Sequence, residues 1–205
     1  MLDHLVYAAP NLDVAVAEMA ERLGVRAAAG GKHRDISTHN ALLSLGDGAY
    51  LEIISLDPAQ PPPSRPRPFG LDTLSGPRLA TWAVKAADIE SRVERARAAG
   101  YNPGEIVALS RNLPDGGQLK WRLTLAEKPV GDGLVPFLIE WISKPHPSES
   151  APKGCTLLNL RGKHPQPGLI QTFLQALEVE LPLVQGPTPA LIAVLQTPRG
   201  QIEIR

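Results

Sequence analysis

The chain has 205 residues, with 21 basic and 21 acidic side chains, one cysteine, 21 prolines and 18 glycines. The balanced charge argues against binding to nucleic acid or an anionic membrane surface, and the single cysteine excludes a disulfide framework or a site built from several thiolates. No apolar run approaches the roughly 18 residues of a membrane helix, and the start lacks a signal-peptide pattern, so we expect a globular cytoplasmic protein.

The first 57 residues predict a βαβββ module. The opening residues alternate in polarity as a strand does, and apolar residues then recur at helical spacing between Asn11 and Gly24, the candidate caps. After a short segment, two apolar runs flank Gly46-Asp47-Gly48, which is typical of a hairpin. The clearest expected elements are strands at 2–9, 40–45 and 49–56 and a helix at 12–23.

Prolines are concentrated in two stretches. Six lie between Pro58 and Pro68, and three more lie within 144–153. Because proline fixes φ and lacks an amide donor, neither stretch predicts a helix interior or a central strand. We therefore expect stiff linkers at 58–76 and 144–154. A proline-rich peptide ligand is the alternative interpretation of 61–68.

The order of the first module recurs after each linker. Residues 77–143 predict a second βαβββ module, and residues 155–205 predict a shorter third one. Helix starts at Leu12, Ile89 and Leu169 lie 77 and 80 residues apart, which indicates internal repetition. We predict an α+β fold in which repeated βαβββ modules form a curled mixed sheet around a cleft, with helices outside. An unrelated α+β protein with coincidental spacing is the alternative.

The last strand of each module carries a glutamate among apolar residues: Glu52, Glu140 and Glu203. A carboxylate in a buried strand needs a partner, because burying an unpaired charge is costly. Strand parity predicts that His4, from the first strand, projects with Glu52 and Glu140 into one cleft. Such a set suits a divalent metal (Mn, Fe, Ni, Zn or Mg), which would polarise a substrate carbonyl while Glu140 or Glu52 moves a proton.

A structural role for these side chains is the alternative. His4 would then bond to the backbone, and the glutamates would pair with Arg111, Arg122 or Lys120. Alignment of the modules also puts Thr81 opposite His4, and a neutral threonine is a poor metal ligand.

A polar cluster precedes the first hairpin. His33, Thr38 and Asn40 stand at a probable strand entry, where their donors and acceptors would orient a polar substrate. The alternative is that they satisfy the local turn.

Two residues of the second module are further candidates for substrate binding. Arg111 would hold a carboxylate through two hydrogen bonds, or else remain a solvated loop charge. Trp121 would wall the cleft, or else belong to the core, to which we assign Trp141. No glycine-rich phosphate motif is present, so we expect no nucleotide cofactor.

Several motifs, taken in order, resemble the vicinal oxygen chelate superfamily and, within it, the glyoxalase-like domain branch. They are LDHLVYAAPNLD, THNALL, YLEIIS and PFLIEW. The resemblance covers residues 1–143 well and 155–205 loosely. It places the superfamily's metal positions on His4, Glu52, Thr81 and Glu140, so that Thr81 departs from the pattern.

The resemblance implies a glyoxalase-like small-molecule enzyme. The implied chemistry is of the lyase, isomerase or dioxygenase type on an oxygenated metabolite, with a divalent metal as the candidate cofactor. The alternative is a metal-free protein that binds or sequesters a small molecule on the same scaffold. The expected partners are a small-molecule substrate or ligand and, in a homodimer, a second copy of the chain.

Overall fold

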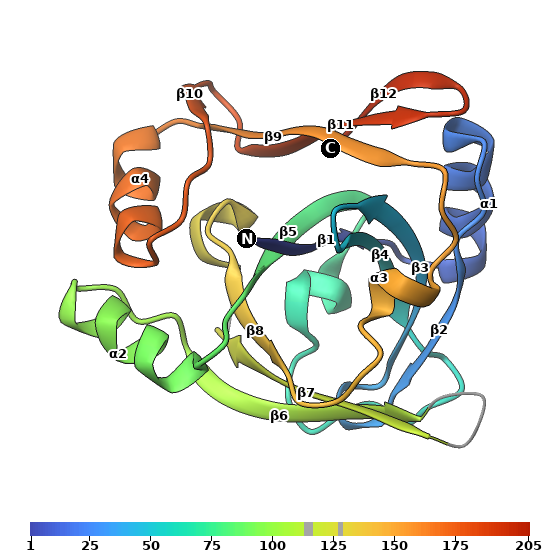
Figure 1. Ribbon diagram of the computed structural model, residues 1–205, viewed down its shortest axis with the longest axis horizontal. Helices are drawn as coiled ribbons and strands as arrows, with labels where there is room; N and C mark the ends of the chain where they lie inside the picture. Colours follow the sequence, from blue (N-terminus) through green and yellow to red (C-terminus); the bar gives the residue numbers. More distant parts are fainter. Residues whose placement is uncertain (113–116, 127–128) are drawn as a thin grey trace.

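The computed structural model describes residues 1–112, 117–126 and 129–205, and its centre is a strongly curled mixed sheet (Figure 1). Within the described residues this sheet has eight strands in the order β2-β3-β4-β1-β5-β8-β7-β6. Helices α1 (Leu12–Leu23) and α2 (Ile89–Ala98) lie outside the curl. The predicted α+β fold is confirmed. The strands are β1 (Leu2–Ala8), β2 (Ala28–His33), β3 (Thr38–Gly46), β4 (Ala49–Leu56), β5 (Arg78–Lys85), β6 (Glu105–Asn112), β7 (Gln118–Leu125) and β8 (Phe137–Trp141).

Two similar halves meet at the middle of this sheet. β1 and β5 pair antiparallel with each other. Each also pairs in parallel with the closing strand of its own half, β1 with β4 and β5 with β8. The two halves therefore share one concave surface, to which both contribute side chains.

The first half follows the sequence prediction closely. Asn11 accepts a hydrogen bond from the backbone N–H of Val14, and Gly24 ends α1 with a left-handed φ of 75°. These are the predicted caps, and they satisfy backbone groups that a helix end leaves unpaired. β2 is an addition: its sequence AAGGKH has few strand-forming residues, and pairing with β3 makes it a strand.

Alternation along β1 and β4 gives the sheet two different faces. Leu5, Leu51 and Ile53 point to the convex face and are fully buried in the main core. Their neighbours His4 and Glu52 point to the concave face, where they line a pocket. Because successive strand residues face opposite sides, the same two strands build both the core and the candidate site.

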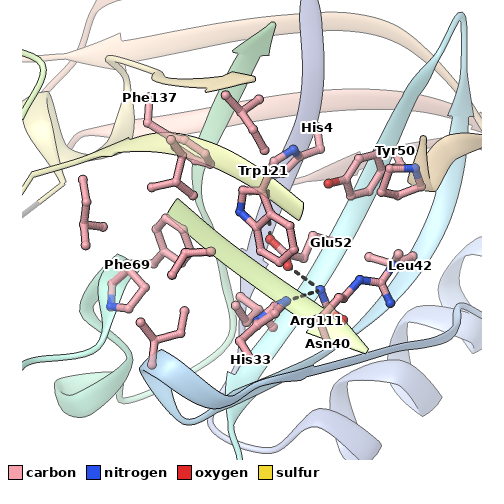
Figure 2. Close-up of a pocket in the computed structure, with 18 of the residues that line it drawn as sticks. His4, His33, Asn40, Leu42, Tyr50, Glu52, Phe69, Arg111, Trp121 and Phe137 are labelled. Carbon is pink, nitrogen blue, oxygen red and sulfur yellow. Dashed lines mark hydrogen bonds and ion pairs between the residues drawn. The ribbon is translucent and has the colours of Figure 1, made fainter. Parts of the chain in front are cut away.

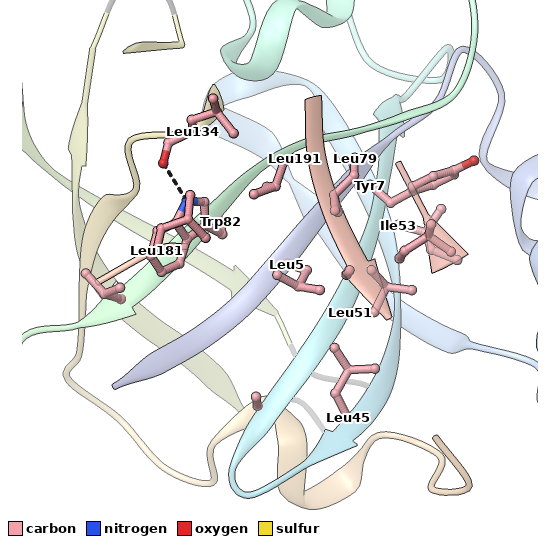
Figure 3. Packing of buried hydrophobic residues seen from close by; sticks show 14 of the residues in the cluster. Leu5, Tyr7, Leu45, Leu51, Ile53, Leu79, Trp82, Leu134, Leu181 and Leu191 are labelled. Atoms are coloured by element: carbon pink, nitrogen blue, oxygen red, sulfur yellow. Dashed lines mark hydrogen bonds between the residues drawn. The ribbon is translucent and has the colours of Figure 1, made fainter. Parts of the chain in front are cut away.

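The third module covers the convex face. Its four-stranded sheet has the order β10-β9-β11-β12, and it is accompanied by α4 (Pro167–Ala176). Leu181 and Leu191 pack in the same core as Leu5 and Leu51 (Figure 3). This module therefore supports the back of the curled sheet and leaves the concave side to the first two modules. The strands are β9 (Thr156–His164), β10 (Leu183–Gln185), β11 (Ala190–Thr197) and β12 (Gly200–Ile204).

Both segments expected as linkers also contribute to the concave side. The first contains the turn η2 (Pro68–Thr73), which lies inside the curl of the sheet, in turquoise in Figure 1. The second contains α3 (Pro147–Ser150), which packs against β3 and β4. Pro68, Phe69 and Pro147 line the pocket. Two further short turns are η1 (Arg34–Ile36) and η3 (Val130–Gly133).

In the part of the chain that the structure describes, no helix combines the length and apolarity needed to cross a membrane.

Candidate functional site

A pocket occupies the concave side of the curled sheet. The space between its walls is about 610 Å³, counting the part open to solvent. Phe69 and Phe137 lie together on the side away from Arg111 (Figure 2), and Phe137 also meets the ring of His4 edge-on, with centroids 5.4 Å apart. A mostly apolar cavity with a few convergent polar groups is the usual form of a small-molecule site. The polar members are His4, His33, Asn40, Tyr50, Glu52 and Arg111.

A buried carboxylate stands behind His4. Asp3, which has no exposed surface, lies 2.6 Å from the Nδ1 atom of His4. It also accepts hydrogen bonds of 3.0 Å from Trp141 Nε1 and His146 Nε2. Burial by itself would raise the pKa of Asp3, but the hydrogen bonds from His146 and His4 outweigh it, and this pKa lies well below its ordinary value. Asp3 is therefore a fixed negative charge.

This arrangement decides which nitrogen of His4 faces the pocket. An ionised carboxylate only accepts hydrogen bonds, so His4 Nδ1 carries a hydrogen and donates a hydrogen bond to Asp3. The Nε2 atom of His4 then faces the pocket, and it lies 3.7 Å from Oε2 of Glu52. The imidazole stacks on Tyr50 with ring centroids 4.7 Å apart, which fixes its plane. Nε2 of His4 and Oε2 of Glu52 thus face each other in the pocket.

The other oxygen of Glu52 is held by a hydrogen-bonded chain. Asn40 Nδ2 donates to Glu52 Oε1 over 2.5 Å and approaches His33 Nε2 at 3.4 Å. His33 Nδ1 lies 2.9 Å from Thr38 Oγ1. Burial lowers the pKa of His33, so its ring is neutral and Nε2 accepts from Asn40. The chain from Thr38 to Asn40 leaves only Oε2 of Glu52 free.

Gly30 leaves room for the Asn40 side chain. A Cβ atom at Gly30 would lie 2.2 Å from Asn40 Oδ1, well inside van der Waals contact. Oδ1 is buried and has no hydrogen-bond partner among the described residues. Gly30 therefore determines where the amide of Asn40 lies. Because Asn40 donates to Glu52, Gly30 also affects the position of that carboxylate.

Arg111 of β6 supplies a buried positive charge. Its residue is only 7% exposed and lines the pocket, and within the described residues it forms no ion pair. Burial lowers its pKa, while the nearby Glu52 and Tyr50 act in the opposite direction. A buried guanidinium without a bound carboxylate retains donors for an anionic ligand. The structure thus places Arg111 in the pocket wall and not in a solvated loop.

Burial also raises the pKa of Tyr50 well above its ordinary value, and the charges of Asp3 and Glu52 add to that effect. Tyr50 is therefore a neutral wall of the pocket.

Two of the three tryptophans of the second half, Trp121 and Trp141, lie in the pocket wall, whereas Trp82 belongs to the main core. Trp121 faces His33 edge-on with centroids 5.7 Å apart. Trp141, which we expected in the core, instead lines the pocket beside Trp121 and donates to Asp3. Trp141 lines the pocket because alternate residues of β8 point to the concave side of the sheet.

The structure does not bring Glu140 together with His4 and Glu52. In β8 the side chains of Phe137, Ile139 and Trp141 line the pocket, so Glu140 points to the opposite face. There it accepts from Arg122, its cross-strand neighbour, which also pairs with Glu90 of α2. The parity expected for this strand was shifted by one residue, and one residue moves a side chain across the sheet.

The expected metal ligands consequently do not assemble. Thr81 lines a neighbouring cavity, and Glu140 is committed to Arg122. No group of three His, Cys, Asp or Glu side chains positioned to hold a metal occurs among the described residues. His4 and Glu52 remain as two candidate ligands, where structural and catalytic sites usually offer at least three. This donor set does not fit the superfamily's metal.

Four residues of the site were missed by the sequence reasoning: Asp3, Tyr50, His146 and Phe69. The sequence did carry a signal for Asp3: it is a carboxylate in an apolar strand, next to His4. Like Glu52, such a carboxylate needs a partner when it is buried. Tyr50 shares the parity of Glu52. His146 and Phe69 lie in segments treated as linkers, and nothing local in their sequence places them beside β1 or β8.

A curled sheet made of two βαβββ halves around a pocket is the arrangement that the sequence motifs predicted. A family model described as the glyoxalase-like domain matches residues 2–178. The chain belongs to this family, as its motifs indicated.

Several solved structures are similar to this chain at low sequence identity. A hypothetical protein from Staphylococcus aureus is similar with a TM-score of 0.63 and 14% identity, over 100% of this chain and 85% of that one. Methylmalonyl-CoA epimerase from Mycobacterium tuberculosis aligns with a TM-score of 0.44 and 20% identity, over 70% of this chain and 88% of that one. A xylose isomerase-like TIM barrel/4-hydroxyphenylpyruvate dioxygenase fusion protein has a TM-score of 0.44 and 15% identity, with coverages of 98% and 32%. No curated protein matches the chain.

Proposed function

We propose that this protein is a metal-independent enzyme that moves a proton on a small carboxylic acid, at a carbon next to a carbonyl group. The observation that carries the proposal is the pairing of His4 Nε2 and Glu52 Oε2, 3.7 Å apart, in a pocket whose wall also holds Arg111. A base, a second proton-accepting group and a buried cation are the parts that enolisation of an anionic substrate needs.

Arg111 binds and orients the substrate. Its guanidinium donates two parallel hydrogen bonds to the substrate carboxylate, in the geometry that arginine prefers. Because the guanidinium is already desolvated, the pocket gains more from the ion pair than a solvated arginine would. The same positive charge stabilises the negative charge that develops on the substrate when a proton leaves.

His4 is the base. Its Nε2 atom takes the proton from the substrate carbon, and the electron pair of the C–H bond moves into the carbonyl to give an enolate. Asp3 stabilises the imidazolium that results, and Glu52 Oε2 lies on the side where the new N–H points. Return of the proton to the substrate completes an isomerisation or an exchange.

A binding protein on the same scaffold is the second candidate. Glu52 Oε1 is already bonded to Asn40, and most of the pocket wall is apolar, as a site for retention without reaction also would be. The two functions differ in whether the ligand's C–H bond is broken.

Proton exchange measured by NMR in D₂O tests the proposal. A panel of short 2-oxo and 3-oxo carboxylic acids is incubated with the protein, and loss of the C–H signal next to the carbonyl is followed. We expect exchange above the buffer rate for at least one acid, and a loss of about a hundredfold or more in His4→Gln. Treatment with a chelator should leave the rate unchanged.

Three outcomes contradict this function. Binding of an acid without exchange would favour the binding protein. Exchange at an unchanged rate in His4→Gln would remove His4 from the chemistry. Loss of exchange after chelation, with recovery on adding a divalent metal, would overturn metal independence.

A further inference from the structure

A second cavity lies directly beside the pocket. The space between its walls is about 480 Å³, again counting the part open to solvent. The two cavities share five lining residues: Pro68, Phe69, Leu123, Leu125 and Phe137. The two cavities therefore adjoin along these residues, and Tyr101 and Val135 of the second cavity also belong to the main core. We call the pocket with His4, Glu52 and Arg111 the head chamber and the second cavity the tail chamber.

The tail chamber differs from the head chamber in its chemistry. Of its described lining residues none is charged, and the polar ones are Thr81, Thr124 and Tyr101. The hydroxyl of Thr124 already accepts from the backbone N–H of Leu138. The remaining wall is made of proline, alanine, valine, leucine and phenylalanine side chains. Such a wall favours hydrocarbon over water.

Two phenylalanine rings separate the chambers. Phe69 of η2 and Phe137 of β8 have their centroids 5.7 Å apart, and Figure 2 shows them at the end of the head chamber away from Arg111. Phe69 has a φ of 63°, a left-handed conformation that bulky residues rarely adopt. Strain of this kind persists where the surroundings impose it, and it occurs often beside ligands.

The backbone around Phe69 is held from both sides. The N–H of Arg67 donates to Asp72 Oδ2 over 2.7 Å, and its guanidinium pairs with Asp72 Oδ1 over 2.5 Å. Arg67 Nε also donates to the carbonyl of Ser37. The turn is thereby closed and attached to the segment before β3.

We propose that the substrate is a carboxylic acid with an extended apolar tail, whose head lies at Arg111 and His4 and whose tail passes Phe69 into the tail chamber. This assignment deepens the proposed function and depends on it for the position of the head. A charged head suits the head chamber, and a hydrocarbon tail is the occupant that suits the tail chamber, whose described lining residues carry no charge. The acid therefore binds in a single orientation.

A chain-length series tests the assignment. Binding of straight-chain 2-oxo acids from 2-oxobutanoate to 2-oxodecanoate is measured by calorimetry with the wild-type protein. We expect the affinity to rise by about three- to fourfold for each methylene that enters the tail chamber. Thr81→Leu, which fills part of the tail chamber, should reduce this gain for long acids and leave 2-oxobutanoate unchanged. Leu158→Ala, at an exposed apolar residue of β9 outside both chambers, is the matched control and should change neither.

A second measurement does not depend on a variant. With a long acid labelled at its terminal methyl group, we expect nuclear Overhauser contacts from that methyl to Val130 and Val135 in the tail chamber. Contacts to residues of the head chamber alone would overturn the assignment, as would equal affinities along the series.

The two proposals fail in distinguishable ways. If short acids bind and Arg111→Gln weakens them, but chain length has no effect, the tail assignment is wrong and the proposed function stands. If long acids bind through the tail chamber and Arg111→Gln has no effect on any acid, the tail chamber stands and the proposed head site is wrong.

Discussion

Glu52 and Glu140 occupy similar places in the sequence and opposite places in the fold. Each is a lone carboxylate in the closing strand of a βαβββ module, with large apolar neighbours on both sides. Glu52 faces the pocket, where Asn40 holds one oxygen and the other faces His4. Glu140 faces outward and pairs with Arg122. A repeated motif therefore does not imply a repeated role.

The difference follows from how the closing strand meets its neighbours. β4 pairs with β1 so that Glu52 lies beside Val6, on the concave side. β8 pairs with β7 so that Glu140 lies beside Arg122 and forms an ion pair with it, while Arg122 also pairs with Glu90. The first half of the molecule thus contributes His4, Asn40 and Glu52 to the pocket, and the second half contributes apolar walls and the cation Arg111.

The largest expected effect separates these two glutamates by activity. Glu52→Gln removes the carboxylate beside His4 and should lower the exchange rate by about 10²–10⁴-fold. Glu140→Gln makes the same chemical change outside the pocket and should leave the rate within about twofold, because Glu140 touches no part of the site. The proton-exchange rates of both variants are measured by NMR, and their folding is checked by circular dichroism. Equal losses in both variants would contradict this expectation.

The next effect separates the two faces of β4 by stability. Leu51→Ala removes a fully buried side chain from the main core and should lower the free energy of unfolding by about 2–5 kcal/mol. Glu52→Gln, one residue further along, should lower it by much less, since an amide of the same shape still fills the space. Urea denaturation of both variants measures this difference. A larger destabilisation in Glu52→Gln would show that Glu52 is mainly structural.

A smaller effect tests how Glu52 is held in place. Gly30→Ala puts a methyl group against Asn40 Oδ1, and the resulting overpacking should cost about 1–3 kcal/mol of stability. Displacement of Asn40 should also lower the exchange rate by about ten- to a hundredfold. Gly76→Ala is the matched control, because no atom lies within 4 Å of its added Cβ. An unchanged exchange rate in Gly30→Ala would show that the position of Asn40 does not affect the function of Glu52.

The smallest effect concerns pH and the carboxylate behind His4. The pKa of Asp3 is lower in the folded state than its ordinary value of 3.8, so at acid pH the folded state binds fewer protons than the unfolded state. The stabilisation from Asp3 is complete above pH of about 4 and is lost as the pH falls toward the folded-state pKa. Asp3→Asn should therefore be less stable at neutral pH but should lose less stability on acidification. Urea midpoints from pH 6 to pH 2.5 measure this, and parallel curves for the two proteins would be evidence against it.

Much of the fold was predictable because its signals are local. The caps Asn11 and Gly24, the hairpin at residues 46–48 and the spacing of the modules depend on short stretches of sequence. The alternation of β1 and β4 is also clear, since polar His4 and Glu52 interrupt apolar runs. Their common face could therefore be inferred from strand parity.

The orientation of β8 could not be inferred in this way. Its sequence FLIEW is apolar except for Glu140, so both faces look equally suited to burial. Phe69 and His146 were equally inaccessible to local reasoning, because proline-rich segments carry no periodicity that shows what they pack against.

The sequence by itself determined the α+β class, the repeated modules, the family and the shared face of His4 and Glu52, since all of these depend on periodicity and on motifs within single elements. Only the tertiary structure decided that Glu140 turns outward, that Asp3 and His146 stand behind His4, and that Arg111 enters the pocket without a carboxylate partner among the described residues. Those facts depend on the register between strands distant in the chain. A shift of one residue in that register reverses which side chains meet, and local sequence does not specify it.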